Sequence, residues 1–593
     1  MNSFEVNDVE KLLSDNMKLI RITKSLCPVC VEEGKFDKML LQSAVYEEGG
    51  KVWQIKKCKD HGIFKSLYWS DYQMYKDAES FSDPGIKLLN SDTKREGLGC
   101  PTNCGLCNEH KSHTALGNIV VTNRCDISCW YCFFYAKEND PIYEPTLEQI
   151  RTMLKRMKNE KPVGANAIQF TGGEPTLRDD LVDIIRIAKE EDYDHIQINT
   201  NGINLNNKPD LAMKIREVGV NNLYMSFDGI TPKTNPKNYW EAAGAIDNCR
   251  KAGLGVVLVP TIIGSVNDHE MGDILRFAIK NNDTIRSVNF QPVSLVGRMP
   301  DNLRKKQRIT IPGAIKRIEK QTNNEIGKEA WFTIPCATKI TNFIEAIKEI
   351  PKYRLSNHFA CGMATYVFFD KEKKKMIPIT NFFDVRGFFE LLHEMTDDIN
   401  KSSFKKVAKA KNLTKLLVNI NKFVDNEKKP KELNFTKILT SALKGNNYEG
   451  LADFHYNSLF VGMMHFQDPY NWDIERVQKC NIHYTTPDGK TIPFCTFNVI
   501  PNLYRDAIQE KFSISPEEWE IKTGKKLKDD KHVRNFSQEQ LEEIRKKYEG
   551  CQMPFGKENI QSDWGEDTEE FDSNNHVSAP SNHPASGCSC CKN

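Results

Sequence analysis

The sequence predicts an α/β protein whose centre is a partial six-stranded barrel with six β/α units. Between residues 116 and about 300, short apolar runs alternate with amphipathic helical patterns, as in parallel sheets that are covered by helices. Cysteine clusters precede this region, and dispersed cysteines follow it. We therefore predict a cysteine-rich metal-binding domain over 1–115, a barrel core over 116–320 and a second cysteine-bearing domain over 321–505. A helical extension over 506–555 and a disordered tail over 556–593 follow.

The barrel elements follow from the spacing of the apolar residues. The predicted strands are 117–122, 167–171, 195–200, 222–227, 255–262 and 286–291. The predicted helices are 146–158, 179–190, 209–217, 239–252 and 268–280. Ligands of such sheets bind at the carboxyl ends of the strands, so the residues that follow each strand are the first candidates for a site.

The bulk composition excludes several classes of protein. The 593 residues carry 82 basic and 80 acidic side chains, a formal net charge of +2, which gives no general reason to bind nucleic acid. No apolar run reaches the roughly 18 to 20 residues of a membrane span, and the amino terminus lacks the layout of a signal peptide. We expect a cytoplasmic protein, with peripheral contact to the inner face of the cell membrane as an option. The 18 cysteines lie mostly in tight groups, which is typical of metal binding in a reducing cell.

The first domain holds six cysteines, which predict at least one metal site. Cys27 and Cys30 have the spacing of a metal knuckle, and Cys58 follows a hairpin whose turn contains Gly49-Gly50. The candidate ligands are Cys27, Cys30, Cys58, Cys100, Cys104 and Cys107. His61 and His110 are either further ligands or ordinary loop residues. Zinc and a mononuclear iron both suit thiolate ligands, so the metal stays open.

The loop after the first barrel strand carries Cys125, Cys129 and Cys132 at C-x3-C-x2-C spacing. Three thiolates hold three irons of a [4Fe–4S] cluster and leave the fourth iron open to a small molecule, whereas a structural cluster normally has four protein ligands. A zinc knuckle or buried thiols are the alternatives. The position at a strand end favours a catalytic cluster.

The second strand ends in Gly172-Gly173-Glu174. Glycines let the backbone approach a ligand closely, and the acid can pair with an ammonium group. Other polar residues end the next strands at the same predicted edge, although each such turn alone is weak evidence. The candidate cofactor-binding residues are Thr171, Gly172, Gly173, Glu174, Asn199, Asn201, Ser226 and Asp228.

The cysteine loop and the Gly-Gly-Glu turn, in this order, resemble the radical SAM superfamily. The resemblance implies that the loop binds a [4Fe–4S] cluster and that the turn binds the amino end of S-adenosylmethionine (SAM). It also implies an electron donor such as ferredoxin or flavodoxin.

The domain after the core holds Cys336, Cys361, Cys480 and Cys495. Pro487-Asp488-Gly489 predicts a hairpin that brings Cys480 and Cys495 together at its open end. Four thiolates would make one closed site, such as an auxiliary [4Fe–4S] cluster. Inert buried thiols are the alternative.

Three further features are less specific. Residues 401–424 predict an amphipathic helix with lysines and no acid, which either lies on an anionic membrane or packs on its own domain. If the helix lies on a membrane, the residues that enter the interface are Phe404, Leu416, Leu417, Ile420 and Phe423. Cys249 is expected to be an inert buried thiol, and Cys551 stays unassigned. The tail ends in Cys588, Cys590 and Cys591, to which the sequence assigns no role.

A closer resemblance is to the archaeal tetraether lipid synthase family. It rests on residues 100–110 just ahead of 121–125, on 259–268, on 289–298 and on 465–471 through 494–495. It implies a lipid substrate, whose two isoprenoid chains are joined at terminal methyl carbons after hydrogen abstraction by a 5′-deoxyadenosyl radical. The auxiliary cluster would hold the first carbon radical on a sulfide. The alternatives are a radical SAM methylase of a pterin-like molecule and an iron–sulfur electron carrier.

Overall fold

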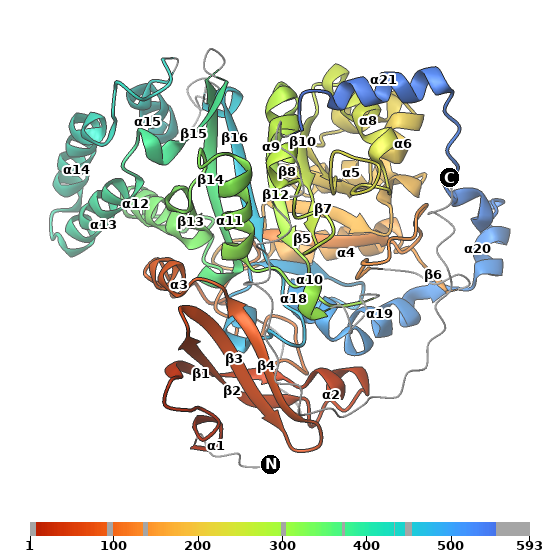
Figure 1. The fold of residues 1–593 in the computed structure, drawn as a ribbon, viewed down its shortest axis with the longest axis horizontal. Coiled ribbons are helices and arrows are strands. Elements are labelled where there is room, and N and C mark those ends of the chain that lie inside the picture. The colour runs from red at the N-terminus through yellow and green to blue at the C-terminus, as the bar shows by residue number, and fades with distance from the viewer. Residues whose placement is uncertain are drawn as a thin grey trace.

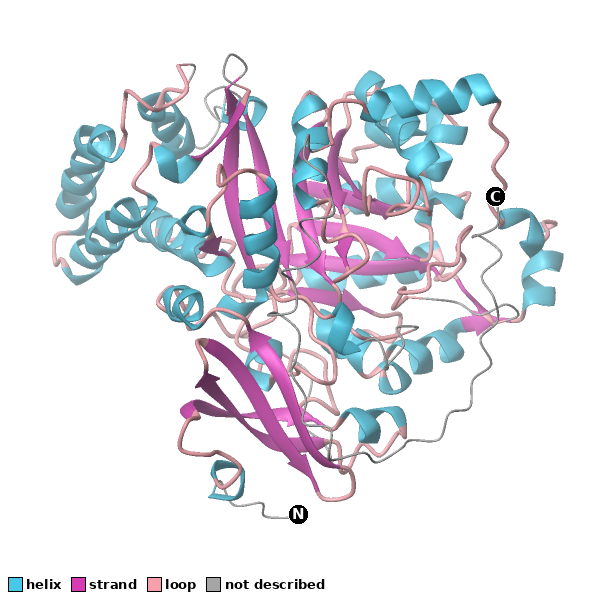
Figure 2. Ribbon diagram, viewed as in Figure 1, coloured by secondary structure: helices cyan, strands magenta, loops and turns pink. Residues whose placement is uncertain are grey.

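The computed structural model describes residues 7–91, 99–134, 140–297, 304–370, 374–431, 433–444 and 454–552. A long sheet runs through the middle of the molecule, and a separate four-stranded sheet lies at one end of it (Figure 1, Figure 2). The predicted disordered tail over 556–593, which includes the three terminal cysteines, lies outside the described residues. In the described part of the chain, no helix is both long and apolar enough to cross a bilayer.

Six parallel strands form the centre of the long sheet and occupy the predicted positions. They are β5 (Leu116–Thr122), β7 (Ala167–Gly172), β8 (His195–Thr200), β9 (Asn222–Ser226), β10 (Gly255–Val259) and β12 (Ile285–Pro292). The predicted strand over 255–262 is interrupted at Pro260, whose ring nitrogen has no hydrogen for the ladder. The residues after it form β11 (Thr261–Ile262), which pairs with β12 alone.

Helices connect these strands and cover one face of the sheet, as predicted for β/α units. They are α4 (Leu147–Lys158), α5 (Leu181–Glu190), α6 (Ile203–Asn207), α7 (Asp210–Glu217), α8 (Tyr239–Lys251), α9 (Met271–Lys280), α10 (Arg304–Gln307) and α11 (Ile311–Gln321). The start of α4 shows why the sequence folds this way. Thr146 and Gln149 form a capping box there, which satisfies two free backbone N–H groups.

The carboxyl-terminal segment extends the same sheet, where the sequence had predicted a domain of its own. The strand β16 (Ser458–Met464) pairs in parallel with β12, and β17 (Ile482–Thr485) pairs in parallel with β5. Antiparallel strands finish both ends of the sheet. They are β13 (Phe332–Thr333), β14 (Gly362–Asp370) and β15 (Lys375–Pro378) beyond β16, and β18 (Thr491–Pro493) beyond β17. Eight parallel strands, rather than six, therefore lie side by side.

The two faces of the parallel strands differ in chemistry. Ile168, Phe170, Ile196 and Ile198 lie in the main apolar core with residues of the covering helices. Because side chains alternate between the faces of a strand, the residues between them point to the opposite, inner face. The intervening residues are Gln169 in β7 and Gln197 in β8, so the inner face of these two strands is polar at these positions.

The four-stranded sheet is the amino-terminal domain (Figure 1). Its elements are α1 (Asn7–Glu10), β1 (Lys18–Leu26), α2 (Pro28–Glu32), β2 (Leu40–Glu48), β3 (Lys51–Cys58), β4 (Gly62–Trp69) and α3 (Tyr72–Glu79). Gly49 and Gly50 both have positive φ, +62° and +75°, in the turn between β2 and β3. Such a two-residue turn matches the twist of a hairpin, which confirms the predicted turn.

This domain docks on the segment 465–473 through buried polar contacts. Asp473 is fully buried and accepts hydrogen bonds from Thr23 at 2.8 Å and from Tyr68 at 3.0 Å, and it pairs with Arg21. The buried Lys56 ammonium donates to the carbonyls of Pro469 at 2.8 Å and Tyr470 at 2.9 Å. The amino-terminal domain is therefore fixed to the segment that follows β16.

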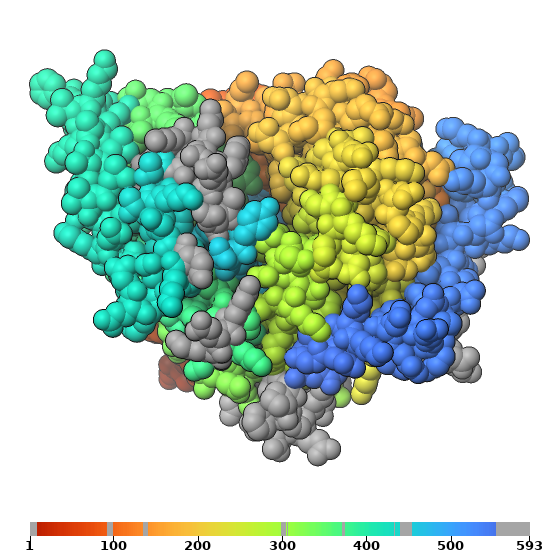
Figure 3. Space-filling model, turned by 90° about the horizontal axis from the view of Figure 1, so that it is seen from above, coloured from red at the N-terminus to blue at the C-terminus, as the bar shows by residue number. Residues whose placement is uncertain are grey.

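A group of helices forms one side of the molecule, opposite the carboxyl-terminal helices (Figure 3). It consists of α12 (Thr338–Lys348), α13 (Val385–Lys401), α14 (Lys405–Asn419) and α15 (Phe435–Lys444). Phe343, Leu392 and Leu416 share a buried cluster between the first three. The predicted basic helix is α14, and its apolar face is in this cluster.

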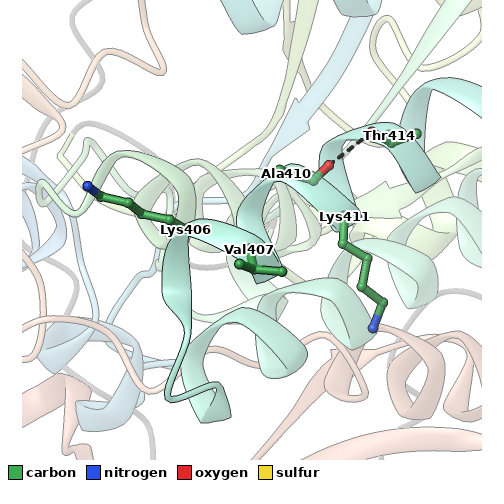
Figure 4. Close-up of a pocket in the computed structure, with 5 residues that line it drawn as sticks. All are labelled: Lys406, Val407, Ala410, Lys411 and Thr414. Atoms are coloured by element: carbon green, nitrogen blue, oxygen red, sulfur yellow. Dashed lines mark hydrogen bonds between the residues drawn. The ribbon is translucent and has the colours of Figure 1, made fainter.

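The surroundings of α14 favour the reading of a helix packed on its own domain. Of the residues predicted to enter a membrane, Leu416 and Ile420 are 0% and 2% exposed, whereas Phe404 and Leu417 are 77% and 39% exposed. Ion pairs join lysines to neighbouring helices: Lys405 and Lys409 with Glu349, Lys411 with Asp398, and Lys415 with Glu394. The outer face bears a shallow hollow lined by Lys406, Val407, Ala410, Lys411 and Thr414 (Figure 4).

The predicted helical extension is present and returns to the central sheet. The last helices are α17 (Ile474–Gln478), α18 (Phe494–Val499), α19 (Arg505–Phe512), α20 (Pro516–Thr523) and α21 (Gln538–Tyr548). Tyr548 stacks on Tyr239 at 4.4 Å and on Phe277 at 5.0 Å between ring centroids. The short strand β19 (Ser513–Ile514) pairs with β6 (Ile142–Tyr143). These contacts hold the end of the described chain against the helices of the barrel region.

Candidate active site and metal centres

The cysteine loop begins where β5 ends, and the Gly-Gly turn packs directly on it. Gly173 N donates to Thr122 O at 2.8 Å, and Glu174 N donates to Arg124 O at 2.8 Å. A Cβ on Gly172, at φ +140°, would lie 2.1 Å from Thr122 O, and one on Gly173 would lie 2.1 Å from Arg124 O. Only glycines permit this approach, so the turn fixes the backbone that carries the cysteines.

Glu174 is fully buried and accepts four hydrogen bonds, two from Thr176 in its own turn and two from the end of β8. Its Oε1 accepts from Thr200 Oγ1 at 2.7 Å and from the amide and hydroxyl of Thr176 at 3.0 and 2.6 Å. Its Oε2 accepts from Asn201 N at 2.7 Å. Burial, and the nearby Asp126 charge, raise the pKa of Glu174 to about 7. An ammonium ligand would favour the ionised form of Glu174, because its positive charge offsets the cost of burying the carboxylate.

The other predicted cofactor residues lie at the same edge of the sheet. Asn201 Nδ2 donates to Asp126 of the cysteine loop at 2.6 Å, and Asn199 Nδ2 donates to Thr171 Oγ1 at 3.2 Å. Asn238 Nδ2 bridges the carbonyls of Asn201 and Ser226 at 2.7 Å each. The structure therefore brings these residues together around the loop.

Asp228 belongs to a buried cluster that the sequence did not reveal in full. Lys237 Nζ lies 2.7 Å from Asp228 Oδ2 and donates to Tyr131 Oη at 3.1 Å, while Tyr131 also donates to Asp228. Burial and the Asp228 charge hold the pKa of Tyr131 well above its ordinary value. Tyr131 lies inside the cysteine motif, but Lys237 is an isolated loop residue with no pattern to single it out.

The residues present fit a [4Fe–4S] cluster with one open iron and a zwitterionic ligand beside it. Cys125 is exposed as a residue, Cys129 and Cys132 are partly exposed, and the thiols of Cys125 and Cys129 each interact electrostatically with that of Cys132. Asn238 Oδ1 is buried without a hydrogen-bond partner, which leaves an acceptor for a bound donor. Acids and one lysine at the same edge offer counter-charges for the amino and carboxylate groups of a ligand.

A compact metal-binding group lies in the amino-terminal domain. The ligand atoms of Cys27, Cys30, Cys58 and His61 all lie within 4.8 Å of one another. His61 Nδ1 is 3.4 Å from the sulfurs of Cys27 and Cys30 and 3.5 Å from that of Cys58. His61 Nε2 faces Glu33 at 3.3 Å, as in metal sites where a carboxylate orients the histidine. Three thiols and one imidazole form a closed tetrahedral zinc set.

Cys100, Cys104 and Cys107 lie in a different loop. Tyr504 clamps this loop, because Cys104 N donates to its hydroxyl at 3.0 Å and the hydroxyl donates to Pro101 O. His110 is not at either group of thiols. Its Nε2 lies 2.7 Å from Cys480 O and 3.1 Å from His483 Nε2. Of the two histidines that the sequence offered, His61 alone joins a group of thiols.

Three of the four carboxyl-terminal cysteines gather around Arg476. Arg476 Nε donates to Cys361 Sγ at 3.4 Å, and its charge also acts on Cys495. Cys480 interacts electrostatically with both Cys495 and Cys361, and the predicted hairpin is present as β17 and β18. Cys336 packs instead against the apolar cluster of α12 to α14. Within the described residues, no hydrogen bond joins it to the other three, although its turn (Ile334–Ala337) contacts the turn that holds Cys361 (Phe359–Cys361).

The two remaining described thiols are buried. Cys249 is 0% exposed in the main core, as expected for an inert thiol. Cys551 is 1% exposed in the same core, and its carbonyl accepts from Arg276. Neither lies in a group of possible metal ligands.

Comparisons with known proteins agree with this geometry. The family model "Radical SAM superfamily" matches residues 119–278, and "HMPTM N-terminal zinc ribbon domain" matches residues 19–70. A 7,8-dihydro-6-hydroxymethylpterin dimethyltransferase of Methanocaldococcus jannaschii is 42% identical over 84% of this chain and 96% of its own length. A probable GTP 3',8-cyclase of the same organism is 29% identical over 30% of this chain and 58% of its own length. A solved radical SAM methyltransferase from Sphaerobacter thermophilus is 14% identical over 53% of this chain and 76% of its own, with a TM-score of 0.26.

The chain thus belongs to the radical SAM superfamily, in the family of the pterin dimethyltransferase that aligns with most of its length. A [4Fe–4S] cluster and SAM are therefore its cofactors, and the cysteine group over residues 27–61 matches a zinc ribbon.

The lipid activity predicted from the closer resemblance is corrected by this comparison. The relative that covers most of the chain is named for methyl transfer to a pterin, not for joining tetraether lipid chains. The inner faces of β5, β7 and β8 carry Asn118, Gln169 and Gln197, which hydrogen-bond to one another.

Proposed function

We propose that this protein is a radical SAM enzyme that transfers methyl groups to a pterin-like small molecule, close to 7,8-dihydro-6-hydroxymethylpterin. The observation that carries the proposal is the 42% identity to the pterin dimethyltransferase across 84% of the chain. The match also covers 96% of the relative's own length.

The chemistry of the inner face supports a polar, hydrogen-bonding substrate. Gln169 Nε2 donates to Asn118 Oδ1 at 2.7 Å, and Gln197 donates to Gln169, so a row of amides crosses three strands. Asn118 Nδ2 is buried without a partner, and Asn289 bonds to Tyr224 farther along the sheet. A pterin ring presents several nitrogen and oxygen atoms, and specific sites recognise such atoms with a few placed polar groups.

Within this proposal the residues of the sheet edge have separate roles. Cys125, Cys129 and Cys132 hold the cluster, which when bound supplies the electron that cleaves SAM to methionine and a 5′-deoxyadenosyl radical. Glu174 receives the ammonium of SAM. The strand-end residues that complete the SAM site are Thr171, Gly172, Gly173, Asn199, Asn201, Ser226 and Asp228. The Gly-Gly turn fixes the position of the cysteine loop relative to the SAM site.

The same proposal includes further iron sites and a protein that donates electrons. Cys361, Cys480 and Cys495 hold an auxiliary iron–sulfur cluster, because three buried or partly buried thiols around a fixed cation suit an anionic cluster. Cys100, Cys104 and Cys107 form another three-thiol loop of the kind that can hold iron. A small electron-transfer protein such as ferredoxin or flavodoxin supplies the electron.

The decisive experiment supplies the pterin to anaerobically reconstituted protein with SAM and dithionite. Mass spectrometry should show pterin products heavier by one or two methyl substitutions, together with 5′-deoxyadenosine. The matched control is the Cys125→Ala variant, which keeps the pterin surface but lacks one cluster ligand. The proposal fails if wild-type protein forms 5′-deoxyadenosine but leaves every tested dihydropterin unmodified.

A further inference from the structure

A buried arginine, the fixed cation beside the carboxyl-terminal thiols, has contacts that define its role more closely. Arg476 lies in α17, is 4% exposed, and donates from Nε to Cys361 Sγ at 3.4 Å. Its other guanidinium contact is to the backbone carbonyl of His465. The guanidinium therefore faces a thiol on one side and the end of β16 on the other.

The charge of Arg476 is not balanced by a carboxylate. Among the described residues, no Asp or Glu oxygen forms an ion pair with it, although Arg308 nearby pairs with Asp468 at 3.1 Å and Arg21 pairs with Asp473. Arginine stays protonated in proteins, and an unpaired buried charge is costly. Its electrostatic partners are Cys361, Cys495 and Tyr68. The Arg476 guanidinium therefore faces thiols, which carry negative charge when they bind a metal or a cluster.

We propose that Arg476 is the counter-ion of an iron–sulfur cluster held by Cys361, Cys480 and Cys495, and that it raises the reduction potential of that cluster. The inference rests on the proposed function in one respect, namely that these thiols bind iron. A reduced cluster carries one more negative charge than the oxidised form. A fixed cation, and an N–H donor to a ligand sulfur, stabilise the reduced form more than the oxidised one.

The arginine also holds the segment on which the amino-terminal domain docks. The His465 carbonyl accepts from Arg476, and Gln467 N donates to Cys495 Sγ at 3.5 Å. A merely structural arginine would act through this segment and leave the potential of a loaded cluster unchanged. The potential of the cluster is therefore the readout that separates the two roles.

The test is an EPR redox titration of the full-length protein, reconstituted with iron and sulfide and poised with dithionite. The signal of this cluster is assigned as the one absent from the Cys480→Ala variant. Arg476→Met removes the charge and the N–H donor, and Arg476→Lys keeps the charge alone. Arg308→Lys is the control, because its Asp468 partner already balances that buried arginine.

The expected order of midpoint potentials is wild type above Arg476→Lys above Arg476→Met, with Arg308→Lys equal to wild type. Equal potentials in wild type and a loaded Arg476→Met would overturn the proposal. Loss of the signal from both Arg476 variants would also overturn it, because the arginine would then act in assembly.

If Arg476→Met alone fails to bind the cluster, a lowered midpoint potential in Arg476→Lys supports the proposal and an unchanged one refutes it. If wild type shows no signal that depends on Cys480, the cluster itself is refuted, independently of SAM cleavage at the other site.

Discussion

Replacing Asp473 by asparagine should loosen the amino-terminal domain from the rest of the molecule. The Asp473 carboxylate is fully buried and receives Arg21, Thr23 and Tyr68, three side chains of the amino-terminal sheet. Asparagine keeps the shape but leaves Arg21 with only the partly exposed Glu475 as a counter-charge. Breaking a buried pair from one side costs about 3–5 kcal/mol. Because the Arg21 side chain is 16% exposed and also faces Glu475 at 3.6 Å, we expect the low end, about 3 kcal/mol.

Hydrogen exchange with mass spectrometry measures this loss of stability directly in the amino-terminal domain. A loss of about 3 kcal/mol corresponds to roughly a hundredfold higher exchange rate in peptides that cover β1 and β4. The control is Glu475→Gln, which removes a carboxylate that is 41% exposed and should change the exchange rate by about fivefold at most. Equal exchange in the two variants would refute the view that a buried charge pair holds this domain.

The pH dependence gives a second check on the same residue. Although burial alone would raise it, the Arg21 charge and the hydrogen bonds hold the pKa of Asp473 well below its ordinary value. A carboxyl whose pKa is lower in the folded than in the unfolded state stabilises the fold fully when the pH is above its unfolded-state pKa, about 3.9. This stabilisation is lost progressively as the pH falls below that value. The difference in protection between wild type and Asp473→Asn should therefore narrow below about pH 4. A constant difference down to pH 3 would mean that the charge is not responsible.

Three further predictions concern the cofactors. Changing Cys125, Cys129 and Cys132 together to alanine should abolish 5′-deoxyadenosine formation while other iron stays bound, and persistent product would refute the assigned loop. Glu174→Gln should weaken SAM binding roughly tenfold in calorimetry, because a charge-assisted bond is lost, with the cluster spectrum retained; unchanged affinity would make the turn purely structural. His61→Ala should release the metal of the amino-terminal group at lower chelator concentration than wild type in a zinc-binding dye assay, and equal retention would exclude His61 as a ligand.

The repeating part of the fold could be predicted because local signals agree there. Residues 167–171 form an apolar run that ends in two glycines, and 181–190 repeats apolar residues at helical spacing, so each element is specified by its own residues. Partner strands are not specified in this way. The run at 482–485 predicts a hairpin with 491–493, but nothing local shows that its other edge pairs with β5.

The metal groups show the same limit. Cys58 and His61 are three residues apart, which made a shared site easy to suspect, and His110 had an equally good position near three cysteines. Only the tertiary contact with His483 removes His110 from the ligands. Likewise, Cys336 could not be separated from the other carboxyl-terminal cysteines, because its environment is set by helices of a later segment. The residue pattern around the lysines of α14 predicted the helix correctly. It could not predict the ion pair of Lys409 with Glu349, because Glu349 lies outside this helix.

The pairing of β16 and β17 with opposite ends of the first six parallel strands has a consequence for synthesis of the chain. While residues up to about 320 are made, both β5 and β12 have an unpaired edge, and those edges are filled only when residues 458–485 have been translated. Exposed edges are prone to pair with other chains. A fragment that ends at residue 320 should consequently aggregate, and a nascent chain has to keep two edges protected until its last third emerges from the ribosome.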